Sequence, residues 1–230
     1  MEALWEGLKE AVRLIVEGDA ELRDIALRTI FVSGIATLLA MVAGVPLGYG
    51  LARGRFRGRT MLLGVVNTGM GMPPVIVGLV VFLLLVRSGP FGDLGLIYTK
   101  RAMILAQFAI SVPLVVGFTA ASVQSLPPAL GDLLQMLGAG RVRTMWILAR
   151  EARLGLLAAV MAGFGSVRAE VGASMTVGGN IAGETRVLTT AIVLETSRGH
   201  QETAIAFGII LLAMAFAVNL VLTYAQQRPR

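Results

Sequence analysis

Long uncharged stretches separate the charged positions of this sequence. Four of them contain no Asp, Glu, Lys or Arg: residues 29–52, 60–86, 102–131 and 203–227. Each exceeds the ~20 apolar residues with which a helix crosses about 30 Å of hydrocarbon. A further stretch, 154–177, is uncharged for its first 14 residues and then carries Arg168 and Glu170. The pattern predicts an all-α integral membrane protein with five transmembrane helices.

A different pattern precedes the first span. Residues 4–16 read LWEGLKEAVRLIV, with apolar side chains at helical spacing among charged ones. This predicts an amphipathic helix in an N-terminal segment, residues 1–25. Two placements stay open: on the membrane surface, or solvent-exposed and packed on the bundle. No basic region leads directly into an apolar one here, so we expect no cleaved signal peptide.

The arginines predict an orientation. The first span is followed by RGRFRGR at residues 53–59, a basic loop that should stay in the cytoplasm. Alternation then places the N-terminus and two loops outside, and the C-terminus inside. The expected cytoplasmic segments hold ten of the Lys and Arg residues and the two outer loops five, which supports this orientation. We expect a multi-pass protein of the cytoplasmic membrane.

Composition supports a membrane protein and narrows the chemistry. Hydrophobic residues make up 56% and charged residues 15%, against a usual quarter charged. The chain has no cysteine and one histidine, His200, which excludes disulfides, thiolate metal sites and a histidine cluster. We expect no metal site and no nucleic-acid partner.

Enzyme signatures are absent from the sequence. It contains no G-x-x-x-x-G-K-[ST], and its only lysines are Lys9 and Lys100, so this chain has no phosphate-binding loop for ATP. It contains no H-E-x-x-H or G-x-S-x-G either. We expect a protein that is not an enzyme and that binds no cofactor itself.

The second span contains the sequence NTGMGMPPVIVG, which includes Pro73 and Pro74. Proline breaks a helix interior but fits a first turn, so we expect a helix from Thr60 to break near Met72 and to restart at the prolines. Unwound backbone at membrane depth must be buried or line a water-filled cavity. The break therefore indicates either a transport path or a kink that only shapes packing.

Residues 125–153, the 125–153 loop, lie between the third and fourth spans. They include PPALGDLLQMLGAGRVRTMWILARE, which predicts two short amphipathic helices joined by a turn at Gly138 to Gly140. Exposed Leu, Met and Trp side chains beside arginines indicate a docking surface. The alternative is a connecting helix lying on the lipid headgroups.

This loop resembles the EAA loop of type I ABC importer permeases. Asp132 stands for the glutamate of the pattern, Leu133 and Leu134 for its alanines, and Arg150-Glu151 for its terminal Leu-Pro. The resemblance implies a coupling helix that sits in a cleft on a separate ATPase. The implied partner-binding residues are Asp132, Leu137, Gly138, Ala139, Arg141, Arg143, Thr144 and Trp146.

The resemblance covers roughly residues 28–224, and after the loop it points to one branch of the family. The segment RAEVGASMTVGGNIAGETRVL is similar to the oxyanion branch, which includes the molybdate permeases, and together with MPPVIVGLVVFLLLVRSGPFG it is most similar to the tungstate-specific permeases. It implies an ABC type I transmembrane domain over residues 26–225, followed by a cytoplasmic tail, 226–230.

The resemblance also implies partners. They are an ABC ATPase dimer that uses ATP and Mg, an extracytoplasmic tungstate- or molybdate-binding protein, and a second copy of the chain. The alternative cargoes are molybdate and sulfate. An ATP-independent secondary transporter is the alternative class, although spans one and two do not resemble spans four and five as an inverted repeat would require.

A polar path needs hydroxyls, amides and helix N-termini rather than many arginines. The spans offer Asn67, Thr68, Gln107, Ser111, Thr119, Ser174, Thr176 and Asn180. Taken singly, each favours an interhelical hydrogen bond over a substrate contact.

Two ionisable residues in span four are functional candidates by default. On a continuous helix, Arg168 and Glu170 would not face each other, so each needs another partner. We interpret Glu170 as structural and Arg168 as an anion-attracting charge, with structural pairing of both as the alternative. The candidates for the translocation path or its structure are Pro73, Pro74, Arg168, Glu170, Thr176 and Asn180.

Overall fold

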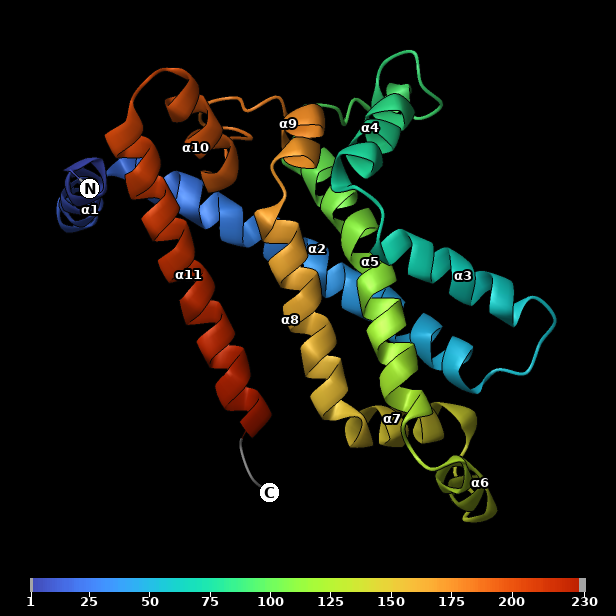
Figure 1. Cartoon of the computed structure of the whole chain (residues 1–230). Helices are drawn as coiled ribbons and strands as arrows, with labels where there is room; N and C mark the ends of the chain where they lie inside the picture. Colours follow the sequence, from blue (N-terminus) through green and yellow to red (C-terminus); the bar gives the residue numbers. More distant parts are fainter. Residues whose placement is uncertain (1, 228–230) are drawn as a thin grey trace.

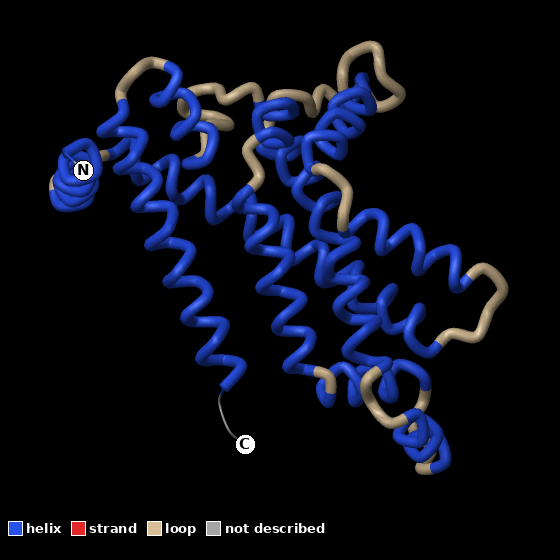
Figure 2. The backbone as a smooth tube through the Cα atoms, viewed as in Figure 1, coloured by secondary structure: helices blue, strands red, loops and turns tan. Residues whose placement is uncertain are grey.

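The computed structural model describes residues 2–227, apart from the side chains of Glu2, Arg168, Ala169 and Ala225. Over these residues the fold is helical, with short connecting loops and no strand (Figures 1 and 2). The α-helices are α1 (Glu2–Val16), α2 (Ala20–Arg53), α3 (Arg59–Met70), α4 (Pro74–Leu85), α5 (Lys100–Gln124), α6 (Pro128–Met136), α7 (Arg141–Glu151), α8 (Arg153–Ala169), α9 (Gly172–Gly178), α10 (Leu188–Ser197) and α11 (Gln201–Gln227), with a 3-10 turn, η1 (Gly92–Leu94), between α4 and α5.

Three described helices are long and apolar enough to cross a membrane alone: α2, α5 and α11. The pairs α3 with α4 and α8 with α9 meet the same criterion only together, and they are bent by 103° and 61°. In Figure 1, α8 runs from α7 toward α9, and α3 runs in from one side before α4 turns toward the end that holds α9. With each bent pair counted as one span, the described residues form the five expected spans, two of them broken.

Helix boundaries differ from the uncharged stretches. α2 starts at Ala20, where the Asp19 carboxylate caps the helix by accepting from the amide of Leu22 at 2.7 Å. The boundary expected between residues 25 and 26 therefore falls inside a helix. α5 ends at Gln124, because Pro127 and Pro128 cannot continue it. Charge-free stretches indicate which residues can lie within the bilayer, whereas capping residues and prolines set where each helix begins and ends.

α5 is the centre of the bundle, with α2, α3, α8 and α9 around it (Figure 1). Its contact with α2 depends on small residues: Gly44 lies against Val115, and Gly48 lies against Thr119. Small side chains let transmembrane backbones approach closely and so strengthen van der Waals packing. This packing matters inside a bilayer because the hydrophobic effect does not drive helices together there.

The two ends of the bundle carry different elements. The 53–59 loop, α6, α7 and the end of α11 lie at one end, and α1, the 86–99 loop, α9 and α10 lie at the other (Figure 1). Residues 178–202 contain the helix α10 and are more structured than a simple connection between spans.

Candidate coupling surface and transport path

The 125–153 loop folds into α6 and α7, joined by a glycine turn. The amides of Gly138 and Ala139 donate to the carbonyls of Gln135 and Leu134, both at 2.9 Å. This pair of bonds is a Schellman motif, which favours glycine because it needs a left-handed residue. Gly138 supplies that residue with φ +79°. The predicted turn is confirmed.

One side of α7 holds this loop to the bundle. Leu148 is fully buried and Thr144 nearly so, and the Thr144 hydroxyl donates to the carbonyl of Ala139 at 3.4 Å. Ala152 is both the C-cap of α7 and the N-cap of α8, so the two helices follow each other without a loop.

The opposite side of the loop is apolar and exposed. Met136 is 83% exposed and Trp146 is 61% exposed; the other large apolar side chains in this group are Leu133, Leu137 and Val142. The Arg150 guanidinium lies 5.5 Å from the centre of the Trp146 ring. Asp132, Arg141 and Arg143 are also exposed. An apolar patch with a charged rim has the composition of a protein interface.

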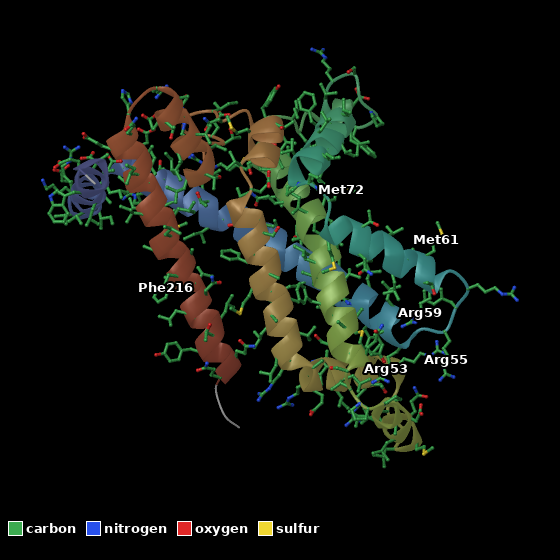
Figure 3. The ribbon with its side chains drawn as sticks, viewed as in Figure 1. Arg53, Arg55, Arg59, Met61, Met72 and Phe216 are labelled. Carbon is green, nitrogen blue, oxygen red and sulfur yellow. The ribbon has the colours of Figure 1, made fainter. Side chains whose placement is uncertain are left out.

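The basic 53–59 loop lies beside the 125–153 loop (Figure 3). Arg59 Nε donates to the carbonyl of Leu51 at 2.7 Å, and Arg53 Nη2 donates to that of Leu126 at 3.4 Å. Arginines there satisfy carbonyls at the end of α2 and at the start of the 125–153 loop, where a positive charge also suits the helix dipole. Both loops are thus fixed to one end of the bundle.

The second span breaks where the prolines predict. α3 ends at Met70, Pro73 is the N-cap of α4, and Pro74 is its first residue. Gly71, Met72 and Pro73 between the two helices are exposed. Because neighbouring helices of this chain leave that backbone uncovered, the break is placed to face a cavity or a second protein surface.

The fourth span is not the continuous helix that the sequence suggested, and this part of the interpretation was wrong. α8 ends at Ala169, and Glu170 adopts an extended conformation before α9. Glu170 Oε1 accepts from the amide of Ala173 at 2.9 Å and so caps α9. A carboxylate at a helix N-terminus is favourable, which explains how this charge is accommodated at the break. The Arg168 side chain lies outside the described residues.

The two broken spans meet where they break. A Cβ atom on Gly78 would lie 2.5 Å from Cα of Ala173, and one on Gly172 would lie 2.5 Å from Cγ2 of Val75. Real Cβ contacts are not this short. Only glycine allows this approach, so α4 and α9 pack as a tight pair directly after Pro74 and Glu170.

Three of the eight polar candidates, Thr68, Ser111 and Thr176, bond within their own helix. Thr176 donates to the carbonyl of Gly172 at 2.8 Å, and Thr68 donates to that of Gly64 at 2.9 Å. An interhelical bond within this set runs from Gln107 Nε2 to Ser174 Oγ, at 3.3 Å. A hydroxyl group can reach a carbonyl one turn away along its own helix, so these bonds need no partner helix. The preference for an interhelical bond over a substrate contact stays a prediction.

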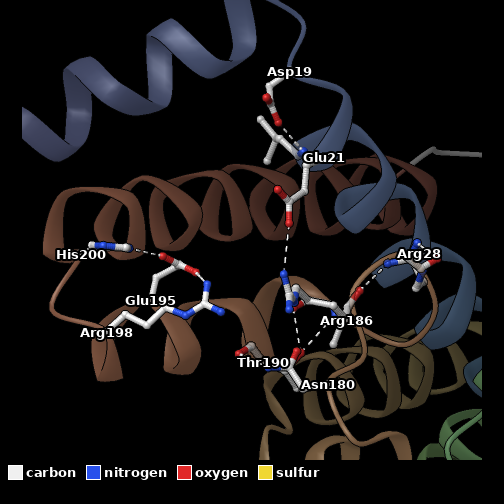
Figure 4. A network of polar contacts seen from close by, with 12 residues as sticks. Asp19, Glu21, Arg28, Asn180, Arg186, Thr190, Glu195, Arg198 and His200 are labelled. Atoms are coloured by element: carbon white, nitrogen blue, oxygen red, sulfur yellow. Dashed lines mark hydrogen bonds and ion pairs between the residues drawn. The ribbon is translucent and has the colours of Figure 1, made fainter.

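A polar network fixes the 179–187 loop at the end opposite α6 and α7 (Figure 4). Arg28, which is 8% exposed, donates to the carbonyls of Arg186 at 2.8 Å and Gly183 at 2.7 Å. Thr29 Oγ1 accepts from the amide of Leu188 at 3.0 Å. The N-terminal part of α2 therefore holds a loop that follows it by more than 150 residues.

Bonds inside this loop add to the network. Thr185 Oγ1 donates to the carbonyl of Gly178 at 2.6 Å and accepts from the amide of Ile181 at 2.9 Å. Asn180 adopts φ +51° and donates from Nδ2 to the carbonyl of Thr190 at 3.4 Å. Asn180 and Thr185 thus bind the protein's own backbone, whereas the sequence had indicated Asn180 as a path residue.

Arg28 was not singled out from the sequence. The available signal was its position one residue before the first uncharged stretch, where an arginine must either snorkel out or find buried acceptors. Nothing in the sequence identified the acceptors, because they are backbone carbonyls of a distant loop.

A family model described as "Binding-protein-dependent transport system inner membrane component" matches residues 44–230. The chain belongs to this permease family. A tungstate uptake system permease protein of Peptoclostridium acidaminophilum is 38% identical over 99% of this chain and 100% of its own length. A probable anion ABC transporter permease protein of Haloferax volcanii is 40% identical over 83% of this chain and 84% of its own.

The permease fold is also found among solved structures. The crystal structure of an amino acid ABC transporter with histidines superposes with a TM-score of 0.67 at 16% identity, covering 94% of this chain and 97% of that one. At this identity the likeness shows the fold alone. The all-helical permease architecture expected from the sequence is thereby confirmed.

Proposed function

We propose that this chain is the membrane-spanning permease subunit of a tungstate importer. The observation that carries the proposal is the similarity to the tungstate uptake permease, which extends over both chains from end to end. Two broken spans and an exposed apolar surface at one end of the bundle support the same function.

The anion itself sets the physical requirement. A bare dianion cannot cross about 30 Å of hydrocarbon, because burying unpaired charge costs many kcal/mol. A path must therefore be polar and open to one side at a time. The breaks before Pro74 and Gly172 fit this requirement, since they bring irregular backbone from two spans together.

The 125–153 loop supplies the coupling in this proposal. An ATPase cleft receives the side that presents Met136 and Trp146, and the motion passes through Ala152 into α8. α8 leads to the Glu170 break, and α9 beyond it packs on α4. Closure of the ATPases thus moves the two broken spans together and reorients the cavity. ATP and magnesium act on the ATPase.

The complete importer follows from stoichiometry and charge. An ATPase pair offers two clefts and this chain has one 125–153 loop, so two copies assemble about a two-fold axis. The basic 53–59 loop and the 125–153 loop face the cytoplasm, with the N-terminus outside and the C-terminus inside. An oxyanion-binding protein delivers tungstate at the outer end, where the 179–187 loop lies.

Uptake into proteoliposomes tests the proposal. The permease is reconstituted with its cognate ATPase and binding protein, and labelled tungstate uptake is measured with excess unlabelled tungstate, molybdate or sulfate. We expect ATP-dependent uptake that tungstate suppresses best. Stronger suppression by molybdate or sulfate would reassign the cargo, and uptake by the permease alone without ATP would indicate a secondary transporter.

A further inference from the structure

The first helix, α1, has three sectors around its circumference. At about 100° per residue, Gly7, Ala11 and Leu14 share the sector that faces α11. Ala11 is 1% exposed, and a Cβ atom on Gly7 would lie 2.3 Å from Cγ2 of Ile205. α1 is therefore packed tightly against α11 through its smallest side chains.

The adjacent sector of α1 is apolar and uncovered. Its members are exposed by 41% to 80%: Leu4, Trp5, Leu8, Val12, Ile15 and Val16. Exposing one such side chain is common, but a contiguous group of six on one helix face marks a surface that another phase or molecule covers.

The third sector is charged, and its charges pair with one another. Lys9 lies 2.8 Å from Glu6, and Arg13 lies 2.8 Å from Glu10 and 3.8 Å from Glu17. These pairs run along the helix and leave no strong excess of one sign on this face. The charged sector therefore suits water at its surface, and it offers a protein partner no complementary charge.

The position of α1 identifies what covers the apolar sector. In Figure 1, α1 is seen end-on and α11 is seen lengthwise. α1 therefore lies roughly perpendicular to α11, a membrane span. It sits at the end of α11 far from α6 and α7. The outward face of α11 is apolar as well, with Phe216 69% exposed and directed away from the bundle (Figure 3).

We propose that α1 lies in the surface of the bilayer and that lipid covers the sector from Leu4 to Val16. Helices of this kind bury their apolar face about 5–10 Å into the boundary between headgroups and acyl chains. Trp5, with the Lys9 ammonium 5.5 Å from its ring centre, has the amphipathic character found at that depth. The inference depends on α11 being a span and not on the cargo.

Spin labels test this placement, and the absence of native cysteines makes single labels straightforward. Cysteine replaces Val12 or Ile15 in the apolar sector and, as matched controls, Lys9 or Arg13 in the charged sector. The full permease is reconstituted in vesicles of phosphatidylcholine and phosphatidylglycerol. Accessibility to oxygen, which partitions into lipid, is compared with accessibility to a water-soluble nickel chelate.

We expect oxygen to be favoured at least several-fold at Val12 and Ile15 relative to the control positions. High accessibility to the nickel chelate at all four positions would place α1 in water and overturn the proposal. Low accessibility to both reagents at Val12 and Ile15 would show that a second copy or another protein covers the sector, which would also overturn it.

A fluorescence measurement keeps the proposal testable if a label disturbs α1. The chain has two tryptophans, so Trp146→Phe leaves Trp5 as the only one. We expect brominated phospholipids to quench Trp5 most strongly when the bromines are near the headgroup. Quenching by aqueous acrylamide with none by brominated lipid would contradict a bilayer location, whatever the importer transports.

Discussion

The 179–187 loop and the 125–153 loop lie at opposite ends of the same bundle and are built in opposite ways. The first is bound at the carbonyls of Gly183 and Arg186 by one buried arginine and closed internally by Thr185. The second is anchored through one side of α7 and leaves Met136 and Trp146 uncovered. The first loop is held by the chain itself, whereas the second presents an apolar surface that the chain leaves uncovered.

This difference indicates where the partners contribute. A loop held by hydrogen bonds from the chain itself keeps its shape without a ligand, which suits a fixed surface that a binding protein meets transiently. An apolar surface on two short helices gains more from a permanent partner, because that partner removes the apolar side chains from water. The predictions below test this contrast, beginning with the largest expected effect.

Removing Arg28 should lower the stability of the end of the bundle that holds the 179–187 loop, without affecting the end that holds α6 and α7. Arg28→Ala leaves the carbonyls of Gly183 and Arg186 without their charged donor, and bonds of this kind contribute about 1.5–3 kcal/mol each. We expect thermal unfolding in detergent to show a loss of roughly 3 kcal/mol, with ATPase capture retained in the folded fraction. The control is Arg23→Ala, an exposed arginine on the same helix. Equal losses in both variants would show that the network is not what stabilises this end.

Removing one tryptophan from each end should separate the two surfaces. Trp146 and Trp5 are 61% and 59% exposed, and each has a cationic group 5.5 Å from its ring centre. Trp146→Ala should weaken ATPase capture by about 2 kcal/mol, as expected of an interface hot spot. Trp5→Ala should leave capture unchanged. The measurement is titration of the ATPase against labelled permease, and similar affinities for the two variants would contradict the contrast.

The glycine turn can be strained without touching the exposed surface. Gly138→Val forces a branched residue into a left-handed conformation, at a cost of about 1–2 kcal/mol. Gly140→Val is the matched control, since Gly140 has φ −64° and space for a side chain. We expect Gly138→Val to lower ATP-dependent uptake several-fold with normal membrane insertion. Unchanged uptake would mean that the α6–α7 geometry is not needed for coupling.

The smallest expected effect is a change in how stability depends on pH, through Glu195 in α10. The hydrogen bond from His200 and the charge of Arg198 lower the pKa of Glu195 from its ordinary value of 4.5. The ionised carboxylate is thus favoured in the folded state, so its contribution is present above pH 4.5 and is lost as pH falls through the lowered pKa. Glu195→Gln should remove a slight part of the acid sensitivity in unfolding scans. Identical pH profiles would show that the pair adds nothing to stability.

The spans and the helix–turn–helix shape of the 125–153 loop could be predicted because their signals are local. Charge-free stretches reported membrane depth, Pro73 and Pro74 located one break, and Gly138 located the turn between α6 and α7. Each of these follows from the chemistry of the residue itself and its immediate neighbours.

The remaining features depend on distant partners or on weak local signals. The acceptors of Arg28 are carbonyls that only the tertiary fold brings near, and the contact of Gly78 with Ala173 joins two separate spans. The break at Glu170 had one local sign, a carboxylate three residues before an amide that it could cap. Hydrophobicity continued across it, so the sequence suggested a continuous helix.

The central claim is that the 125–153 loop docks an ATPase. It is tested most directly by asking whether the ATPase protects one introduced cysteine from labelling. Cysteine replaces Met136 on α6 or, as the control, Leu94 at the opposite end, which is 62% exposed, and both variants react with a maleimide in permeabilised membrane vesicles. We predict that adding the ATPase slows labelling at Met136 at least several-fold and leaves Leu94 unchanged. Equal labelling at Met136 with and without the ATPase would contradict the assignment of the 125–153 loop as its docking site.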